Sequence, residues 1–269
     1  MDYETPDGSR FSLREIWGNP DPENEAFAKF LYTTISANVD GGAYFGRLED
    51  FAEDVDEGDV LSSLEPVPTE AIYPLYDQTF TKAPPFDATK HYLKVPSFTW
   101  EDCQPGETFV ADCVLKEVRV LERLARHGHP NIVGYNGCVV KDDRITHISL
   151  EKCQVNMIDY AEDAGSQVDA PKLLQDVKAG IDFLHSLDLA HNDINPGNIC
   201  IVDGRAVIVD FDGCMPFGEE LMKGTSVANN DNGRPISAAT NDLRGFEDLE
   251  DVLLSLVEQE TAMPPDQEE

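Results

Sequence analysis

Apolar residues recur along the chain with two different periods, and each period predicts its own kind of element. Steps of three and four residues predict helices over 109–127, 171–187 and 242–256, and a shorter helix over 25–39. Short apolar runs bounded by turn residues predict strands at 72–76, 91–95, 131–138 and 145–151. Two further runs, 199–202 and 206–209, flank Asp203-Gly204 and predict a hairpin.

The order of these elements predicts an α+β fold with two lobes. The expected division is an N-terminal extension with an acidic linker at 1–65, a small β-rich N-lobe at 66–150 and a mainly helical, shortened C-lobe at 151–269. Residues 213–241 are rich in Gly, Asn and Ser and are expected to form a long functional loop. The chemistry is expected in the cleft between the lobes.

Composition adds a strong constraint from charge. The chain has 269 residues, of which 41% are hydrophobic, so a folded core is expected. Lys and Arg number 20 against 52 Asp and Glu, which gives a net charge of −32. Such a field repels nucleic acid backbones and anionic membranes, so neither is expected as a partner. A nucleotide would need local basic groups and a metal ion.

Cysteine spacing and the first residues indicate the compartment. The six cysteines include no CxxC pair, which argues against a zinc cluster. The chain begins Met1-Asp2-Tyr3-Glu4 with no apolar run behind it, and no stretch reaches the length of a membrane span. A cytoplasmic or nuclear protein with reduced thiols is expected.

The segment His191 to Asn198, which reads HNDINPGN, carries the most specific chemistry. It offers Asp193 and, five positions later, Asn198. Asp210 follows at the end of the apolar run 206–209. Phosphoryl transfer from a nucleotide needs a carboxylate to orient a hydroxyl, together with an amide and a carboxylate to hold Mg²⁺.

Over residues 66–256, and most strongly over 185–212, the chain resembles a eukaryotic-type protein kinase domain of a divergent, fungal kind. The resemblance implies a bilobal protein-kinase-like fold that binds ATP and Mg²⁺. It makes Asp193 the base that orients the substrate hydroxyl, and Asn198 and Asp210 the metal ligands. His191 would support the loop, and Asp242 would anchor it.

The same resemblance assigns residues upstream. Glu117, in a helix followed by His129-Pro130-Asn131-Ile132-Val133, falls at the family's ion-pair glutamate. Its partner would be Lys94, with Lys90 as the competitor, and the pair would hold the α- and β-phosphates. Leu150 would lie beside the adenine, to which Glu151 and Cys153 would offer backbone groups.

Departures from the family pattern leave two alternatives, an active kinase and an inactive one. Asn192 replaces the arginine that meets a phosphorylated activation loop, so control by phosphorylation of that loop is not expected. Asn195 replaces a lysine that neutralises the transferred phosphate, and Asp212 replaces the glycine after Asp210-Phe211. No Gly-rich phosphate loop precedes Lys94; the run 41–46 is interpreted as a turn. The helices that complete a standard C-lobe are missing.

Three functions therefore remain as alternatives. The first is a Ser/Thr protein kinase whose protein substrate is unknown. The second is a pseudokinase that binds nucleotide or acts as an interaction scaffold. The third is a small-molecule kinase, since HNDINPGN also resembles the loop of aminoglycoside and choline-type phosphotransferases, and an acidic surface could attract a cationic substrate.

Overall fold

The computed structural model describes residues 2–4, 10–18, 29–39, 42–99, 106–164, 167–221 and 233–262. The chain divides into two compact units, and each is described by itself. The first unit contains Met1–Thr79, Lys94–Leu115 and Cys138–Ile148. The second contains Phe80–Leu93, Lys116–Gly137 and Ser149–Glu269.

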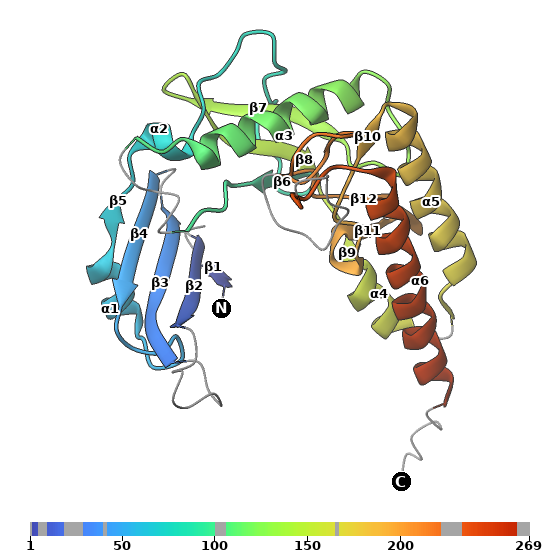
Figure 1. Ribbon diagram of the computed structural model, residues 1–269, viewed down its shortest axis with the longest axis horizontal. Helices are drawn as coiled ribbons and strands as arrows, with labels where there is room; N and C mark the ends of the chain where they lie inside the picture. The colour runs from blue at the N-terminus through green and yellow to red at the C-terminus, as the bar shows by residue number, and fades with distance from the viewer. Residues whose placement is uncertain are drawn as a thin grey trace. The chain divides into compact units, whose positions relative to one another are not determined.

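An antiparallel five-stranded sheet dominates the first unit (Figure 1). Its strands follow one another in space as they do in sequence: β1 Asp2–Glu4, β2 Arg10–Gly18, β3 Lys29–Val39, β4 Gly42–Leu48 and β5 Glu65–Pro66. The short helices α1 Glu57–Ser63 and α2 Thr69–Ile72 belong to the same unit. Val60 of α1 packs on one face of the sheet with a buried cluster made by Phe11, Leu13, Ile35 and Ala37.

Three expectations for this unit are wrong. Residues 29–39 form β3 instead of a helix, because they pair along their length with β2 and β4 and include the β-branched run Thr33-Thr34-Ile35. The glycine-rich run is strand from Gly42 onward, and Gly41 lies outside the described residues. The strand expected at 72–76 is also absent from the described residues: Ile72 ends α2, and Leu75 makes an isolated bridge to Arg144 beside Pro74, which has no N–H to donate.

A long helix follows in the sequence, as predicted, together with three strands that pair into one sheet. The strand expected at 131–138 begins only at Tyr135. The strands lie in the order β6-β8-β7, with bounds β6 His91–Lys94, β7 Tyr135–Lys141 and β8 Arg144–Glu151. Helix α3 runs over Phe109–Ala125. Its buried face includes Val110, Val114, Val118 and Leu121, at the spacing that predicted it.

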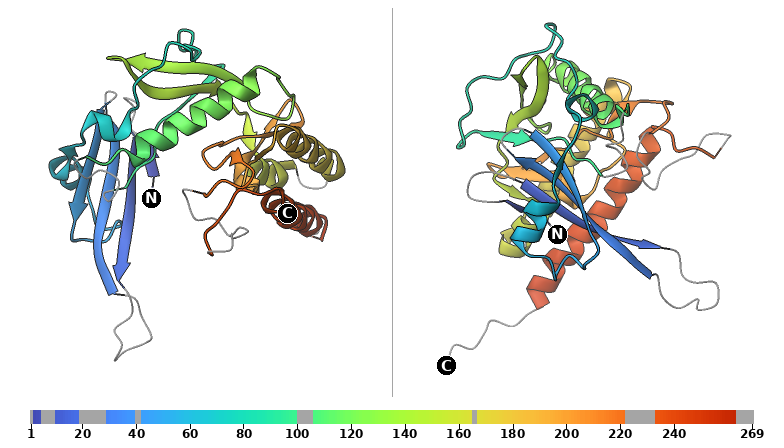
Figure 2. Two further views of the ribbon diagram at one scale, coloured as in Figure 1. Left: turned by 45° about the horizontal axis from the view of Figure 1, so that its top comes forward. Right: turned by 90° about the vertical axis from the view of Figure 1, so that its left-hand side faces the viewer.

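The second unit carries most of the helices. They are α4 Met157–Ala164, α5 Ala170–Ser186 and α6 Ala239–Ala262, and α5 lies beside α6 (Figures 1 and 2). The hairpin β11 Ile199–Val202 and β12 Arg205–Ile208 is joined by β9 Val155–Asn156, and β10 Leu189–Ala190 pairs with β13 Met215–Pro216. The predicted helices and hairpin of this region are confirmed. No helix among the described residues is long and apolar enough to cross a membrane.

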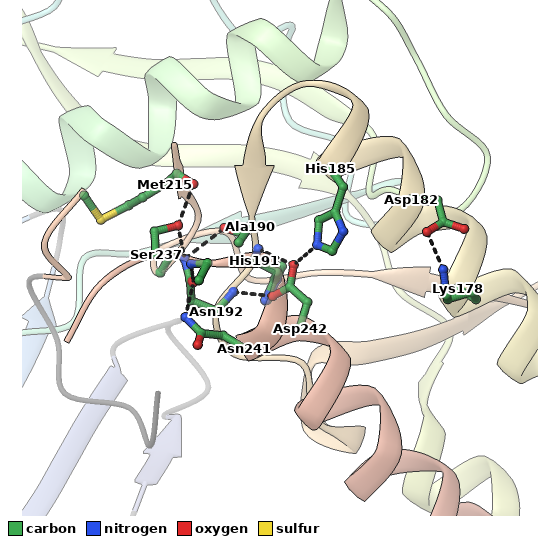
Figure 3. A network of polar contacts seen from close by, with 12 residues as sticks. Lys178, Asp182, His185, Ala190, His191, Asn192, Met215, Ser237, Asn241 and Asp242 are labelled. Carbon is green, nitrogen blue, oxygen red and sulfur yellow. Dashed lines mark hydrogen bonds and ion pairs between the residues drawn. The ribbon is translucent and has the colours of Figure 1, made fainter. Parts of the chain in front are cut away.

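Helix α6 fixes the position of the loop that follows β10. The carboxylate of Asp242 is fully buried and accepts hydrogen bonds from the backbone N–H groups of His191 at 3.0 Å and Asn192 at 2.7 Å. Its Oδ2 also lies 2.9 Å from Nε2 of His185 on α5 (Figure 3). One turn further along, a Cβ added to Gly245 would lie 2.4 Å from the carbonyl oxygen of Ile194. The prediction that Asp242 anchors this loop is confirmed.

Replacing Asp242 with Asn should lower the free energy of unfolding by about 2–4 kcal/mol, because an amide NH₂ would then face backbone donors in a buried site. Urea unfolding followed by circular dichroism measures the loss. The exposed Asp248→Asn on the same helix is the matched control and should stay within about 0.5 kcal/mol of the parent. Equal stability of the two variants would contradict the anchoring role.

Gly245→Ala should destabilise the protein by about 1–3 kcal/mol, because the added methyl overlaps the Ile194 carbonyl and α6 must move away from the loop. Gly58→Ala in α1 is the control, since its Cβ would meet only the flexible carboxylate of Asp56 at 3.1 Å. Thermal unfolding of both variants compares them. A Gly245→Ala protein as stable as Gly58→Ala would show that the close approach of α6 is not needed.

Candidate functional site

The segment His191 to Asn198 folds into a turn that brings Asp193 and Asn198 together. Asn195 caps the short 3₁₀ helix η3, Pro196–Asn198, by accepting a hydrogen bond from the Gly197 N–H at 2.9 Å. Nδ2 of Asn198 donates to the backbone oxygen of Asp193 at 2.9 Å and to its Oδ2 at 2.8 Å. The amide oxygen of Asn198 is thereby turned away from Asp193, as a metal ligand requires.

His191 connects this loop to the end of β12. Its ring is fully buried, and Nε2 lies 3.0 Å from the carbonyl oxygen of Val209. A carbonyl can only accept, so Nε2 carries the proton. The ring also meets Phe211 edge-on, with centroids 5.1 Å apart. Among the described residues Nδ1 has no partner. These contacts give His191 a supporting role.

Asp210 directly follows Val209, whose carbonyl oxygen contacts His191. The N–H of Val209 donates to the carbonyl oxygen of Asn198 at 2.9 Å, so a backbone hydrogen bond joins the segments that carry the two expected metal ligands. Asp210 has φ of 60° and Asn192 has φ of 65°, left-handed values that non-glycine residues adopt at an energetic cost. Such strain is concentrated at functional sites.

The chemistry of the donor set fits Mg²⁺ and a nucleotide. Within the described ranges no group of three or more His, Cys, Asp and Glu side chains could hold a metal ion. A metal held by Asn198 and Asp210 would therefore need oxygens from phosphate groups and water to complete its coordination, which is the usual arrangement for Mg²⁺ on ATP.

Asn192 is the centre of a polar network that the sequence did not predict (Figure 3). Its Nδ2 lies within 3.0 Å of three acceptors: the carbonyl oxygens of Ala190 and Gly213 and Oγ of Ser237. Its Oδ1 accepts from Nδ2 of Asn241 at 2.9 Å. The network ties the loop to residues that follow Asp210 and precede α6. Neutral hydrogen bonds thus occupy the place where the resembled family has an arginine.

Glu117 lies on α3 and is 4% exposed. Burial raises the pKa of the Cys214 thiol well above its usual range, and the negative charges of Asp242 and Glu117 raise it further. Glu117 therefore acts electrostatically on the segment just after Asp210. Lys94, half-buried at the end of β6, belongs to the first unit, so its ion pair with Glu117 stays a prediction.

The residues expected around an adenine ring lie at the end of β8 and just after it. Leu150 is buried, and the N–H of exposed Glu151 donates to the Gly134 oxygen at 2.7 Å. The N–H of Lys152 donates to the Lys90 oxygen at 2.8 Å. Cys153 comes next, and its backbone groups stay candidates for adenine binding.

The side chain of Cys153 forms a disulfide with Cys200 of β11. The expectation of reduced thiols is wrong for this pair. No spacing signal links two cysteines that lie 47 residues apart in sequence. Cys113, Cys138 and Cys214 are thiols, and Cys103 lies outside the described residues.

Comparison with known proteins agrees with this geometry. A family model described as the protein kinase domain matches residues 99–229, a range that contains Glu117, Asp193, Asn198 and Asp210 and leaves out Lys94. The fission yeast "Sensor for unfolded proteins in the ER ire1" is 36% identical over 116 residues, 37% of this chain and 10% of that protein.

Two further relatives show the same pattern. The human "Serine/threonine-protein kinase/endoribonuclease IRE2" is 34% identical over 39% of this chain and 12% of its own length. The Xenopus laevis "Serine/threonine-protein kinase TAO3" is 30% identical over 36% of this chain and 11% of its own length. The chain spans about a tenth of the length of these relatives. Together with the fold, these matches show that the chain contains a protein kinase-like domain.

Proposed function

We propose that this chain is an ATP- and Mg²⁺-dependent phosphotransferase of the Ser/Thr protein kinase type. The observation that supports this most is the arrangement around Asn198. The side-chain NH₂ group of Asn198 donates to both the backbone oxygen and the carboxylate of Asp193. The backbone carbonyl of Asn198 accepts from the N–H of Val209, the residue before Asp210. The proposed base Asp193 and the two proposed metal ligands thus lie on segments that hydrogen bonds hold together, which supports the proposal.

In this proposal each predicted residue keeps a separate task. Asn198 and Asp210 hold Mg²⁺, which bridges phosphate oxygens and offsets the strongly negative charge of the chain. Asp193 orients the attacking hydroxyl. Lys94, held by Glu117, binds the α- and β-phosphates.

The adenine would be bound by the end of β8 and the residues that follow it. Leu150 would contact the ring, and Glu151 and Cys153 would offer backbone hydrogen-bonding groups. Because the side chain of Cys153 is engaged in the disulfide, only its backbone could serve this purpose. Specificity for adenine would then come from main-chain groups.

A pseudokinase is the second candidate, and two observations favour it. Asn195, at the position of a phosphate-neutralising lysine, uses its side chain locally: Oδ1 accepts from Gly197 and Nδ2 donates to the Asp193 oxygen at 3.1 Å. The glycine-rich run is part of β4, paired with β3 and β5. In this case the same site would bind nucleotide without turnover, or would serve only as a scaffold.

The possible partners other than ATP include nucleic acid and small-molecule substrates. The charge of −32 argues against nucleic acid, but one relative, the human IRE2, is named an endoribonuclease, so this exclusion rests on charge alone. A small-molecule kinase remains a third reading, and phosphate appearing on aminoglycosides or choline but not on proteins would decide for it.

Asp193→Ala should lower the rate of Mg²⁺-dependent phosphate transfer from radiolabelled ATP to a generic Ser/Thr substrate by about 10²- to 10⁴-fold, because the group that orients the hydroxyl is removed. Asp182→Ala, an exposed carboxylate on α5, is the control and should retain the parent rate. Undiminished transfer in Asp193→Ala would refute the assigned role. No transfer by the parent would favour the pseudokinase.

Mg²⁺-ATP at 100 times its Kd should stabilise the protein by about 2.7 kcal/mol, since a ligand that binds only the folded state shifts the unfolding equilibrium. Differential scanning fluorimetry would detect this as a rise in Tm. Asp210→Ala should remove the part of the shift that depends on Mg²⁺. A parent protein with no shift at saturating nucleotide would leave only the scaffold role.

A further inference from the structure

The Cys153–Cys200 disulfide joins two segments of the proposed nucleotide site. Cys153 follows Glu151 and Lys152, which extend from β8, and Cys200 is the second residue of β11, directly after Asn198 and Ile199. Their Cα atoms lie 5.9 Å apart, within the ordinary range for a disulfide. The bond therefore connects the segment expected to bind adenine with the strand that continues from an expected metal ligand.

An open hollow lies beside this bond, and one of the two cysteines lines it. Cys153 is half-buried and lines the hollow, whereas Cys200 is buried. Cys153 is therefore the cysteine of the pair that a small reagent in the hollow would meet. Attack on the sulfur of Cys153 would leave Cys200 as the departing thiolate.

The hollow has the groups to bind an anion. Lys90, His91 and Lys152 line it, which is a local concentration of basic side chains in a very acidic chain. Nζ of Lys152 donates to the Ala88 oxygen, and Nζ of Lys90 lies 3.7 Å from Asp87. Opposing charges come from Glu151 and Asp203. An anion that also carries an amino group would pair with both the basic and the acidic side chains of the hollow.

One further donor in the hollow lacks a partner. Nδ2 of Asn136 is buried and makes no hydrogen bond with any described residue. An unsatisfied buried amide donor is unfavourable, so an acceptor supplied by a ligand or by water is favoured there.

We propose that Cys153–Cys200 is a reversible redox site that reacts with an anionic low-molecular-weight thiol of the glutathione type bound in this hollow. Glutathione carries two carboxylates, one ammonium group and two amide carbonyl acceptors, which suits the mixed charges and the Asn136 donor. The oxidised form of the protein binds nucleotide more tightly, and this part rests on the proposed function.

The chemistry is two thiol–disulfide exchanges. A glutathione thiolate attacks Sγ of Cys153, forms a mixed disulfide and releases the Cys200 thiolate, which takes a proton from solvent. A second glutathione thiolate attacks the glutathione sulfur of the mixed disulfide and releases Cys153 as a thiolate, which is protonated in turn. The protein disulfide gains two electrons, and two glutathione molecules become one glutathione disulfide. Oxidation follows the same steps in reverse.

Preorganisation of the chain indicates which redox state should bind nucleotide more tightly. When the bond is closed, the backbone groups of Glu151 and Cys153 are held against the hairpin, so ligand binding has less chain entropy to remove. When it is open, β9 still pairs with β11 through Cys200 and Asn156, but the covalent restraint is lost. Nucleotide binding should therefore stabilise the disulfide, and the disulfide should strengthen nucleotide binding.

The site itself is tested without nucleotide. Full-length protein is equilibrated at a series of ratios of reduced to oxidised glutathione, alkylated and analysed peptide by peptide. Cys153 and Cys200 should change state together, and the thiol of Cys113 serves as the internal reference. Cys153 and Cys200 remaining thiols, or remaining a disulfide, at every ratio would overturn the proposal.

The hollow is tested by reduction rates. Lys90→Gln/Lys152→Gln should slow reduction by anionic glutathione about 3-fold or more relative to neutral dithiothreitol, because the local attraction for an anion is removed. Lys172→Gln/Lys178→Gln on α5 is the control with the same loss of charge and should leave that ratio unchanged. An unchanged ratio in the Lys90/Lys152 variant would exclude binding in the hollow.

The regulatory part is tested by Mg²⁺-ATP affinity in both redox states. The oxidised parent should bind about 5-fold more tightly or better. This difference should vanish in Cys153→Ser/Cys200→Ser and persist in Cys113→Ser. Equal affinity in both states of the parent would overturn regulation but leave the proposed function intact. No binding in either state would overturn the proposed function and with it the regulation, while the glutathione titration would still decide the redox site.

Discussion

A single buried carboxylate organises the candidate site. Asp242 is fully buried and is compensated by two backbone N–H groups of the loop and by the His185 ring. A buried charge of this kind is stable only where donors surround it, so the loop backbone has little freedom to take another path. Gly245 allows α6 to approach Ile194 closely, and the geometry around Asp193 and Asn198 follows from that restraint.

Neutral contacts continue the organisation on the other side of the loop. Asn192 binds backbone and side-chain groups on both sides of the long loop after Asp210, and none of these contacts needs a phosphate group. The arrangement of Asp193 and Asp210 is therefore built into the fold instead of depending on a modification. His191 extends the same framework by meeting Val209 and Phe211.

The sequence predicted the second unit better than the first, and the reason is physical. Helix α5 carries apolar residues at local, regular spacing, and the hairpin around Gly204 has its own turn signal. In 29–39 the same apolar spacing fitted a helix, and distant pairing with β2 and β4 decided for a strand. Likewise, Asp193 and Asn198 belong to one local motif, whereas Ser237 and Cys200 meet their partners 45 and 47 residues away in sequence.

The most direct test of the central claim is the position of a metal. Crystals grown with Mn²⁺ and a non-hydrolysable ATP analogue would locate the ion by its anomalous scattering. The account predicts a manganese peak within coordination distance of the Asn198 amide oxygen and the Asp210 carboxylate, with phosphate oxygens completing its shell. Nucleotide bound with its metal away from both residues, or no metal peak at saturating analogue, would contradict it.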